Sequence, residues 1–294
     1  MKDIRDLEKD IYKVLDSGID HDPSPNLAAE YAMRIGGEMA KATRPRSQER
    51  EHGKLWASDL GENCLRKQYY KFNSTDDKEQ LLGHTKFKFL YGNILEEAVL
   101  YLAEEAGHDV AHQQCRVETD FNNGWVVSGR VDAVIDGVLV DVKSTSSFGY
   151  KKYEKEGLNP GNDTFGYLWQ LGFYYHHSEF VHADDEAGFV WIDKQNGHIL
   201  YNSTWDYIPS AQQIATKVDH LSDAAVRLDP FRIPPVPEGT SGNMKLSTKC
   251  SYCDYKKKCW EDANGGKGLR TFLYSNGPVY MTKVKREPKV EELK

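Results

Sequence analysis

Two aspartates and a lysine are spaced so that a tight turn would bring them together. The dipeptide Asp136-Gly137 favours a two-residue type I′ turn, because both central residues of that turn need positive φ. Such a turn pairs the residues that flank it, and counting outward places Asp132 opposite Asp141, with Cβ atoms about 5 Å apart. Strand alternation puts Lys143 on the same face as Asp141. Like charges this close repel, and a divalent cation is the simplest group that would offset them.

These residue types suit the hydrolysis of a phosphodiester. Carboxylates that hold Mg²⁺ or Mn²⁺ can supply an activated water and neutralise charge on the phosphoryl oxygens. A nearby ammonium can steady the nucleophile or the transition-state oxygens. The alternative is a hairpin whose charges are simply solvated on its outer face.

Further polar residues fall at suitable places before and after this hairpin. Glu96 offers a third carboxylate on the preceding helix; the adjacent Glu97 is a competing candidate, whose alternative role is solvation of the helix. Gln170 and Tyr174 are four residues apart and share one face of a later helix. Their alternative role is the polar edge of an aromatic helix.

Three cysteines near the C-terminus form the pattern C-x-x-C-x-x-x-x-x-C, namely Cys250, Cys253 and Cys259. Thiolates at this spacing suit a tetrahedral site for zinc or an iron–sulfur cluster, with Cys64, far upstream, as a candidate fourth ligand. The spacing leaves the choice between the two open. We expect Cys115, on a predicted strand, to be a small core residue.

Cations surround these cysteines and form a candidate DNA-binding set: Arg66, Lys67, Lys256, Lys257 and Lys258. If the cysteines meet, these cations meet as well and create a patch that attracts phosphate. Lys151 and Lys152 follow the aspartate–lysine strand and could add to it. The alternative for any such run is a solvated charged surface.

The composition limits the classes of protein to consider. At 294 residues, with 39% hydrophobic and 12% aromatic residues, the chain can bury one large core or two small ones. The net charge of −7 excludes a generally basic surface but leaves room for a local basic groove. Apolar runs are too short to span a membrane, the N-terminus lacks a signal peptide, and five cysteines predict a reducing, cytoplasmic setting.

Periodicity predicts alternating helices and strands, and hence an α/β fold. Predicted helices cover 27–42, 86–106, 165–177 and 211–228, and predicted strands cover 109–118, 125–135, 138–144, 187–192 and 199–203. We expect 150–161 to be an irregular connection. The predicted domains are a helical N-terminal extension (1–55), a catalytic domain that includes the cysteines (56–262) and a C-terminal tail (263–294). The end of that tail, 283–294, is charged, and we expect it to be poorly ordered.

The motif order G-x-x-x-E, G-R-V-D, D-V-K and Q-x-x-x-Y resembles the PD-(D/E)XK nuclease superfamily in its RecB-like branch. The split cysteine pattern resembles the iron–sulfur members of that branch, which include CRISPR-associated RecB-type exonucleases, the AddB nuclease domain and related phage exonucleases. The resemblance covers Cys64 to Cys259. It implies a restriction-endonuclease-like core, with a central mixed sheet flanked by helices, and an iron–sulfur-stapled region of helices and loops.

The resemblance also implies roles for the residues that match the motifs. Mg²⁺ or Mn²⁺ would be held by carboxylates and one backbone carbonyl: Asp132, Asp141, Glu96 and the carbonyl of Val142. Lys143 would be the catalytic lysine, and Gln170 and Tyr174 would form the motif behind the site. The four cysteines would bind a four-iron, four-sulfur cluster. Glu96 stands where many members of the branch carry a histidine.

The leading expectation is a metal-dependent DNA exonuclease that acts on single-stranded ends. Its setting would be recombination, repair, replication or phage DNA processing in a bacterium or phage-infected host cell, with a protein partner in a recombination or replication complex. The alternatives are an endonuclease or nickase on the same core, and a catalytically idle protein that binds DNA ends in an assembly. The intact set of Asp132, Asp141 and Lys143 favours an enzyme.

Overall fold

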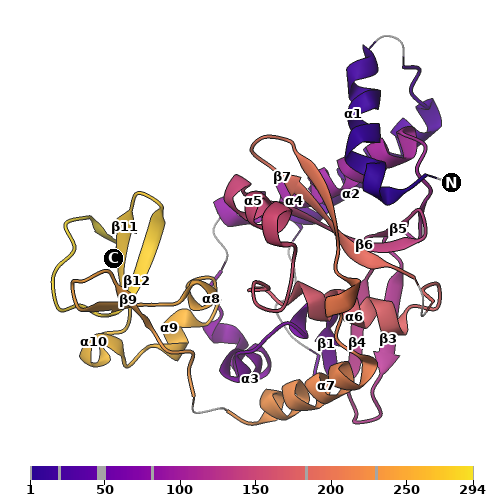
Figure 1. Ribbon diagram of the computed structural model, residues 1–294. Coiled ribbons are helices and arrows are strands. Elements are labelled where there is room, and N and C mark those ends of the chain that lie inside the picture. The colour runs from indigo at the N-terminus through magenta and orange to yellow at the C-terminus, as the bar shows by residue number, and fades with distance from the viewer. Residues whose placement is uncertain are drawn as a thin grey trace. The chain divides into compact units, whose positions relative to one another are not determined.

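A computed structural model describes residues 2–18, 21–44, 51–80, 83–182, 185–228 and 231–293 (Figure 1). The chain forms two compact units. The first contains the described residues of Met1–Ser47, Gly53–Gly61 and Leu82–Val218, and the second contains those of Gln48–His52, Glu62–Leu81 and Asp219–Lys294. We predicted boundaries after residues 55 and 262, whereas the two units divide the chain at other positions. Residues 45–50 of the predicted N-terminal extension are outside the described residues.

The first unit is built on a five-stranded mixed sheet in the order β2-β5-β6-β7-β8. Its strands are β2 (Val110–Ala111), β5 (Ala133–Ile135), β6 (Val138–Thr145), β7 (Ala187–Asp193) and β8 (Ile199–Ser203). Strands β6 and β7 are parallel and the other pairs are antiparallel. The β5–β6 turn has positive φ at Asp136 (50°) and Gly137 (83°), and Ile135 pairs with Val138. The predicted turn and register are therefore confirmed.

A second, three-stranded sheet in the first unit has the order β1-β4-β3. Its strands are β1 (Lys54–Trp56), β3 (Arg116–Asp120) and β4 (Val126–Arg130). The single strand predicted over 125–135 is in fact β4 followed by β5, which belong to different sheets, and the strand predicted over 109–118 is likewise divided between β2 and β3. Asp132 lies at the break between β4 and β5. Its carbonyl accepts a hydrogen bond from the Gln114 amide (3.2 Å), which fixes the backbone there.

Helices from the N-terminal half of the first unit cover the valine face of β6. They include the 3₁₀ turn η1 (Ile4–Asp6) and the helices α1 (Leu7–Ser17), α2 (Pro25–Thr43) and α4 (Gly83–Glu105). Ile11 and Leu100 are fully buried and join the same cluster as Val140 and Val142. The helices that we predicted as a separate N-terminal extension thus contribute to the core of the first unit.

The connection from β6 to β7 contains two helices, α5 (Ser147–Glu156) and α6 (Tyr167–His177). Helix α5 replaces the irregular connection expected over 150–161. Ser146 caps it by accepting a hydrogen bond from the Gly149 amide (3.3 Å), and Gly157, with positive φ, follows its end. Tyr150 and Tyr153 are buried on one face of this helix. Their spacing of three residues is typical of a helix and was the sequence signal that the prediction missed.

The second unit consists of short helices and a five-stranded antiparallel sheet in the order β13-β11-β12-β10-β9. The helices are α3 (Leu65–Asn73), η4 (Thr75–Asp77), α8 (Thr248–Ser251), α9 (Lys256–Cys259) and α10 (Ala263–Gly266). The strands are β9 (Val236–Glu238), β10 (Asn243–Lys245), β11 (Arg270–Tyr274), β12 (Gly277–Lys283) and β13 (Glu292–Leu293). In the chain, β8 is followed by η5 (Trp205–Tyr207) and α7 (Ala211–Val226), and the division between the two units falls within α7. The first unit also contains η3 (Ala57–Asp59).

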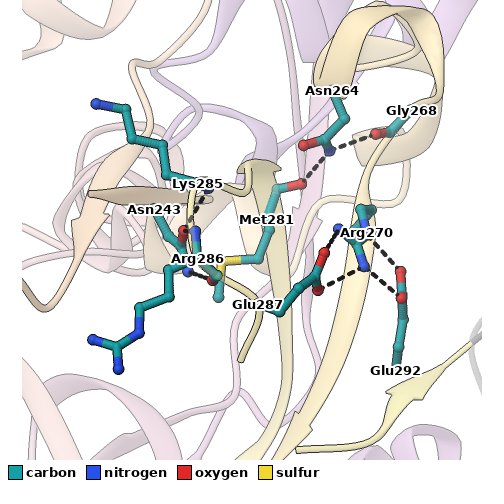
Figure 2. Close-up of polar contacts among 9 residues, drawn as sticks. All are labelled: Asn243, Asn264, Gly268, Arg270, Met281, Lys285, Arg286, Glu287 and Glu292. Carbon is teal, nitrogen blue, oxygen red and sulfur yellow. Dashed lines mark hydrogen bonds and ion pairs between the residues drawn. The ribbon is translucent and has the colours of Figure 1, made fainter. Parts of the chain in front are cut away.

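The C-terminal segment is tied into this second sheet, which corrects the expectation that the charged end of the chain is poorly ordered. Figure 2 shows Asn243 Oδ1 accepting hydrogen bonds from the backbone amides of Lys285 and Arg286 (2.7 and 2.9 Å). The Arg270 guanidinium forms ion pairs with Glu287 and Glu292. No helix among the described residues is long and apolar enough to cross a membrane.

We predict that Ile11→Ala lowers the free energy of unfolding of the first unit by about 2–5 kcal/mol, because it opens a cavity in the shared core. Leu15→Ala, on the same helix but at a side chain that is 56% exposed, should change it by less than about 0.5 kcal/mol. Chemical denaturation followed by circular dichroism measures both. Equal effects of the two variants would show that the N-terminal helices are not part of this core.

Candidate active site

The structure brings Asp132, Asp141 and Lys143 together in the first unit. The Lys143 ammonium forms an ion pair with Asp141 and lies 3.8 Å from Asp132 Oδ2. Asp132 Oδ2 also accepts a hydrogen bond from the Val142 amide (2.8 Å). Lys143 Nζ is 3.5 Å from the Val142 carbonyl oxygen. The carboxylates, the ammonium and the backbone group expected from the sequence therefore share one small region.

The strand order explains why these carboxylates are buried. Strand β6 is paired on both sides, with β5 and β7, so a side chain at its centre is enclosed by its neighbours. Asp141 is 1% exposed and Asp132 is 9% exposed. The buried Oδ2 atom of Asp141 has the Lys143 ammonium as its ion-pair partner. That ammonium offsets part of the cost of burying the carboxylate.

Glu96 supplies a third carboxylate from α4. The charges of Asp132, Lys143 and Asp141 all act on it, and its Oε1 accepts a hydrogen bond from Gln114 Nε2 (2.8 Å). Glu97 faces a different set of groups, with its Oε2 3.9 Å from Arg34 Nη1 of α2. The structure thus places Glu96, rather than Glu97, with the aspartate–lysine group.

Two glycines allow the close packing that the site needs. A Cβ atom at Gly129 would lie 2.6 Å from the Tyr174 hydroxyl oxygen and 2.8 Å from the Ala57 Cβ. A Cβ atom at Gly92 would lie 3.3 Å from the Ser144 Oγ. Gly129 therefore leaves space for the tyrosine behind the site, and Gly92 lets α4 approach β6 closely enough to deliver Glu96.

Helix α6 lies behind the carboxylates with its polar side chains toward them. Gln170 Nε2 donates long hydrogen bonds to Asp141 Oδ1 (3.3 Å) and to the Tyr174 hydroxyl (3.4 Å). The Lys143 ammonium lies 5.7 Å from the ring centre of Tyr167. The predicted shared face of Gln170 and Tyr174 is confirmed as geometry, and Tyr167 joins them.

Burial controls the protonation of this group. It raises the pKa of Glu96 to about 9, with a further contribution from the Asp132 charge, and raises the pKa of Asp141 to about 7. It also raises the pKa of Asp132, against the opposing effects of Lys143 and the Val142 amide. Burial lowers the pKa of Lys143, but the charges of Asp141 and Asp132 outweigh it, so that pKa lies above its usual value. Without a bound cation, the site therefore holds extra protons and one firmly charged ammonium.

The four cysteines of the split pattern line one small pocket in the second unit, and no disulfide joins them. Burial raises the pKa values of Cys64, Cys253 and Cys259, to about 12 for Cys253. Cys115 is in the first unit, partly buried and away from that pocket. As the side chains are placed, no group of three or more His, Cys, Asp or Glu residues within the described ranges could hold a metal ion, in either unit.

The cations of the predicted DNA-binding set lie around these cysteines, but most are paired with acids of the same unit. Lys67 contacts Glu62 (2.9 Å), the largely buried Lys256 contacts Glu79 (2.8 Å), and Lys258 lies 3.7 Å from Asp77. Arg66 donates a hydrogen bond to the Tyr70 hydroxyl (2.7 Å). Lys257 is exposed. DNA binding by this set remains a prediction, with Lys257 the most accessible member.

The sequence profile of the PD-(D/E)XK nuclease superfamily matches residues 39–260. The chain belongs to this superfamily. Membership supports nuclease activity on DNA, and members of the superfamily generally use Mg²⁺ or Mn²⁺. The match includes the aspartate–lysine hairpin, the α4 glutamate and the cysteine region, in agreement with the resemblance found in the motifs.

Solved structures show a more distant likeness to this PD-(D/E)XK chain. SSO0001 is 15% identical, with a TM-score of 0.46, and the match covers 75% of this chain and 91% of that one. An alkaline exonuclease from Laribacter hongkongensis is also 15% identical, with a TM-score of 0.40 and coverage of 60% and 88%; its complex with dAMP gives a TM-score of 0.36. With TM-scores below 0.5, these likenesses say nothing about the activity of this chain. A search of the curated proteins found no match.

Three contributors to the site were missed in the sequence. Gln114 has φ of 55° and holds both the Asp132 backbone and the Glu96 side chain, but an isolated glutamine gives no sequence signal. Gly129 and Gly92 were visible as the glycines of G-R-V-D and G-x-x-x-E. The role of Gly92 could have been inferred, since residues four apart on a helix share a face and Gly92 therefore lies on the same face of the helix as Glu96.

We predict that the metal-free protein loses stability as the pH rises from 7 to 9. The folded state retains a proton on Glu96 up to about pH 9, whereas the unfolded chain has released it, and stability falls wherever the folded state binds more protons. Glu96→Gln should reduce this fall, while Glu154→Gln, at an exposed position of α5, should leave it unchanged. Thermal melting in EDTA across this pH range is the measurement, and equal pH dependence in wild type and Glu96→Gln would contradict the prediction.

Proposed function

We propose that this protein is a metal-dependent DNA exonuclease that acts on single-stranded ends. The observation that carries the proposal is the buried group of Asp132, Asp141 and Lys143, with Glu96 beside it. A cluster of two buried aspartates, a partly buried glutamate and one partly buried lysine carries an excess of negative charge when ionised. Such a cluster is unfavourable as a purely structural feature, and it becomes favourable when it binds a divalent cation.

The chemistry of the donors suits Mg²⁺ or Mn²⁺, which prefer carboxylate and carbonyl oxygens. As the side chains are placed they do not yet converge on one point, so binding would require them to turn toward the ion. Asp132, Asp141 and Glu96, with the Val142 carbonyl, would hold the ion. When bound, it supplies a more acidic water and neutralises charge on the phosphate. The raised pKa values of Glu96 and Asp141 mean that these groups give up protons when the ion binds, so metal affinity should increase with pH.

The protein groups contribute positioning and charge. Lys143 keeps its proton and places a positive charge beside the carboxylates, where it can hydrogen-bond the attacking water or a phosphoryl oxygen. Gln170 holds one oxygen of Asp141, and Gln114 holds one oxygen of Glu96. These contacts limit the rotation of each carboxylate. The second oxygen of Asp141 is paired with the Lys143 ammonium, so an ion bound there would share that oxygen with Lys143.

The preference for single-stranded ends is supported by the resemblance of the motif order and cysteine pattern to the exonuclease members of the RecB-like branch. Such an activity would serve recombination, repair, replication or phage DNA processing. An endonuclease or nickase would use the same carboxylates and is the outcome if a free end proves unnecessary.

A four-iron, four-sulfur cluster in the second unit is a further part of the proposal. Support comes from the four free cysteines that line one pocket and from the cations beside them, Lys67, Arg232 and Lys256, which would offset the charge of the thiolates. When bound, a cluster would link α3 to the α8–α9 segment across a long stretch of chain. Zinc is the alternative occupant.

We predict that Mg²⁺ or Mn²⁺ supports the cleavage of linear single-stranded DNA, and that Asp141→Asn or Lys143→Ala lowers the rate at least about 100-fold, by losing a metal ligand or the ammonium. Glu154→Gln should cleave like wild type. Gel assays on linear and circular single strands give the rates. Equal cleavage of circular DNA would replace the exonuclease assignment with an endonuclease, and full activity of Asp141→Asn would overturn the site itself.

We predict that protein purified without oxygen is brown and contains iron and sulfide in a 4:4 ratio, the stoichiometry of the proposed cluster. Cys250→Ala should lose the colour and melt at lower temperature, because binding to the folded state alone stabilises it. Cys115→Ala serves as the matched control and should retain the iron. Elemental analysis that finds stoichiometric zinc and no iron would replace the cluster with a zinc site.

A further inference from the structure

Phe165 is an exposed aromatic residue close to the candidate active site. It lies just before α6, and its side chain is 49% exposed. Its ring centre is 5.6 Å from that of Tyr167, which in turn is 5.7 Å from the Lys143 ammonium. These two distances place the Phe165 ring within about 11 Å of Lys143 Nζ. A base of a DNA strand bound at the carboxylates would be within reach of this ring.

The loop that carries Phe165 is held firmly by the backbone. Asp163 accepts hydrogen bonds from the amides of Gly166, Tyr167 and Leu168, at 2.8 to 2.9 Å. Gly166 has φ of 76°, and a Cβ atom there would lie 2.1 Å from the Gly61 Cα. The loop is therefore pressed against a neighbouring segment with no side chain between them, so Phe165 is presented in a fixed position rather than on a flexible loop.

A cation lies along the same loop. Lys152 Nζ donates a hydrogen bond to the Asn162 carbonyl (3.3 Å) and is 5.8 Å from the ring centre of Tyr153. It belongs to the partly buried side of α5, directly after the aspartate–lysine strand. Lys152 thus contacts the loop three residues before Phe165. Proteins that bind single strands combine rings that stack on bases with cations that attract the phosphates.

We propose that Phe165 stacks on an unpaired base of the substrate strand, within about three nucleotides of the phosphate that is cleaved, and so positions the strand across the carboxylates. This upper limit comes from the Phe165–Tyr167 and Tyr167–Lys143 distances, 5.6 and 5.7 Å, and from a rise of roughly 3.4 Å per stacked nucleotide. The inference rests on the proposed function and adds a base-recognition contact to it. Because every base has a flat face, the contact favours single strands without selecting a sequence.

The test measures the binding of a labelled single-stranded oligonucleotide in EDTA, by fluorescence anisotropy. Phe165→Ala should weaken binding roughly 5- to 150-fold, the equivalent of ~1–3 kcal/mol for one stacked base, and Phe165→Trp should restore it. The matched control is Phe148→Ala, because Phe148 is also in the first unit and is 84% exposed. It should bind like wild type. Circular dichroism and thermal melting confirm that each variant is folded.

A second set of oligonucleotides has a single abasic site at successive positions from the end. Wild type should lose affinity for one of these positions, and Phe165→Ala should be insensitive to the same position. Two binding results would overturn the stacking role: unchanged affinity in Phe165→Ala, or an equal loss of affinity in Phe148→Ala. The role would also be overturned if Phe165→Ala bound every abasic oligonucleotide more weakly than wild type, by the same factor as the intact strand. If wild type cleaves DNA with Mn²⁺ while these results are seen, the proposed function stands; if wild type neither binds nor cleaves, both fail.

Discussion

The repulsion between two buried carboxylates is the constraint on which the first unit depends. Asp132 and Asp141 are almost inaccessible to water, and the Lys143 ammonium is the positive group that contacts both. Burial of charge is costly, and it is tolerated where partners or a bound cation offset it. The site can therefore exist in two forms, one that retains protons on its acids and one that exchanges them for a cation.

The backbone around the site brings the charged and polar side chains close to the two carboxylates. The strand pairing is interrupted between β4 and β5, which belong to different sheets, and Asp132 lies at this interruption. The Gln114 amide donates a hydrogen bond to the Asp132 carbonyl and so fixes the backbone there. Gly129 lets Tyr174 lie close to the carboxylates, since a Cβ atom there would lie 2.6 Å from the tyrosine hydroxyl, and Gly92 leaves room for the Ser144 Oγ, which would lie 3.3 Å from a Cβ atom there. The parallel pairing of β6 with β7 requires a long crossover, and its second helix supplies Gln170 and Tyr174.

The second unit has its own architecture and its own chemistry. Its sheet is entirely antiparallel and includes the C-terminal segment, which Asn243 and Arg270 tie down (Figure 2). The cysteines of the split pattern come from the N-cap of α3 and from the α8–α9 segment, more than 180 residues apart in the sequence, and they line one pocket. The proposed cluster would strengthen a unit of small elements, while the residues proposed for hydrolysis are in the first unit.

The sequence by itself determined the local features: the turn at Asp136-Gly137, the register that places Asp132 near Asp141, and the period that puts Gln170 and Tyr174 on one face. These depend on backbone geometry over a few residues, which composition and spacing express directly. Tertiary structure alone decided that the N-terminal helices complete the core, that β4 and β5 belong to different sheets, and that Gln114 holds Glu96. Those outcomes depend on contacts between segments distant in the chain, and no local pattern encodes which segments will meet.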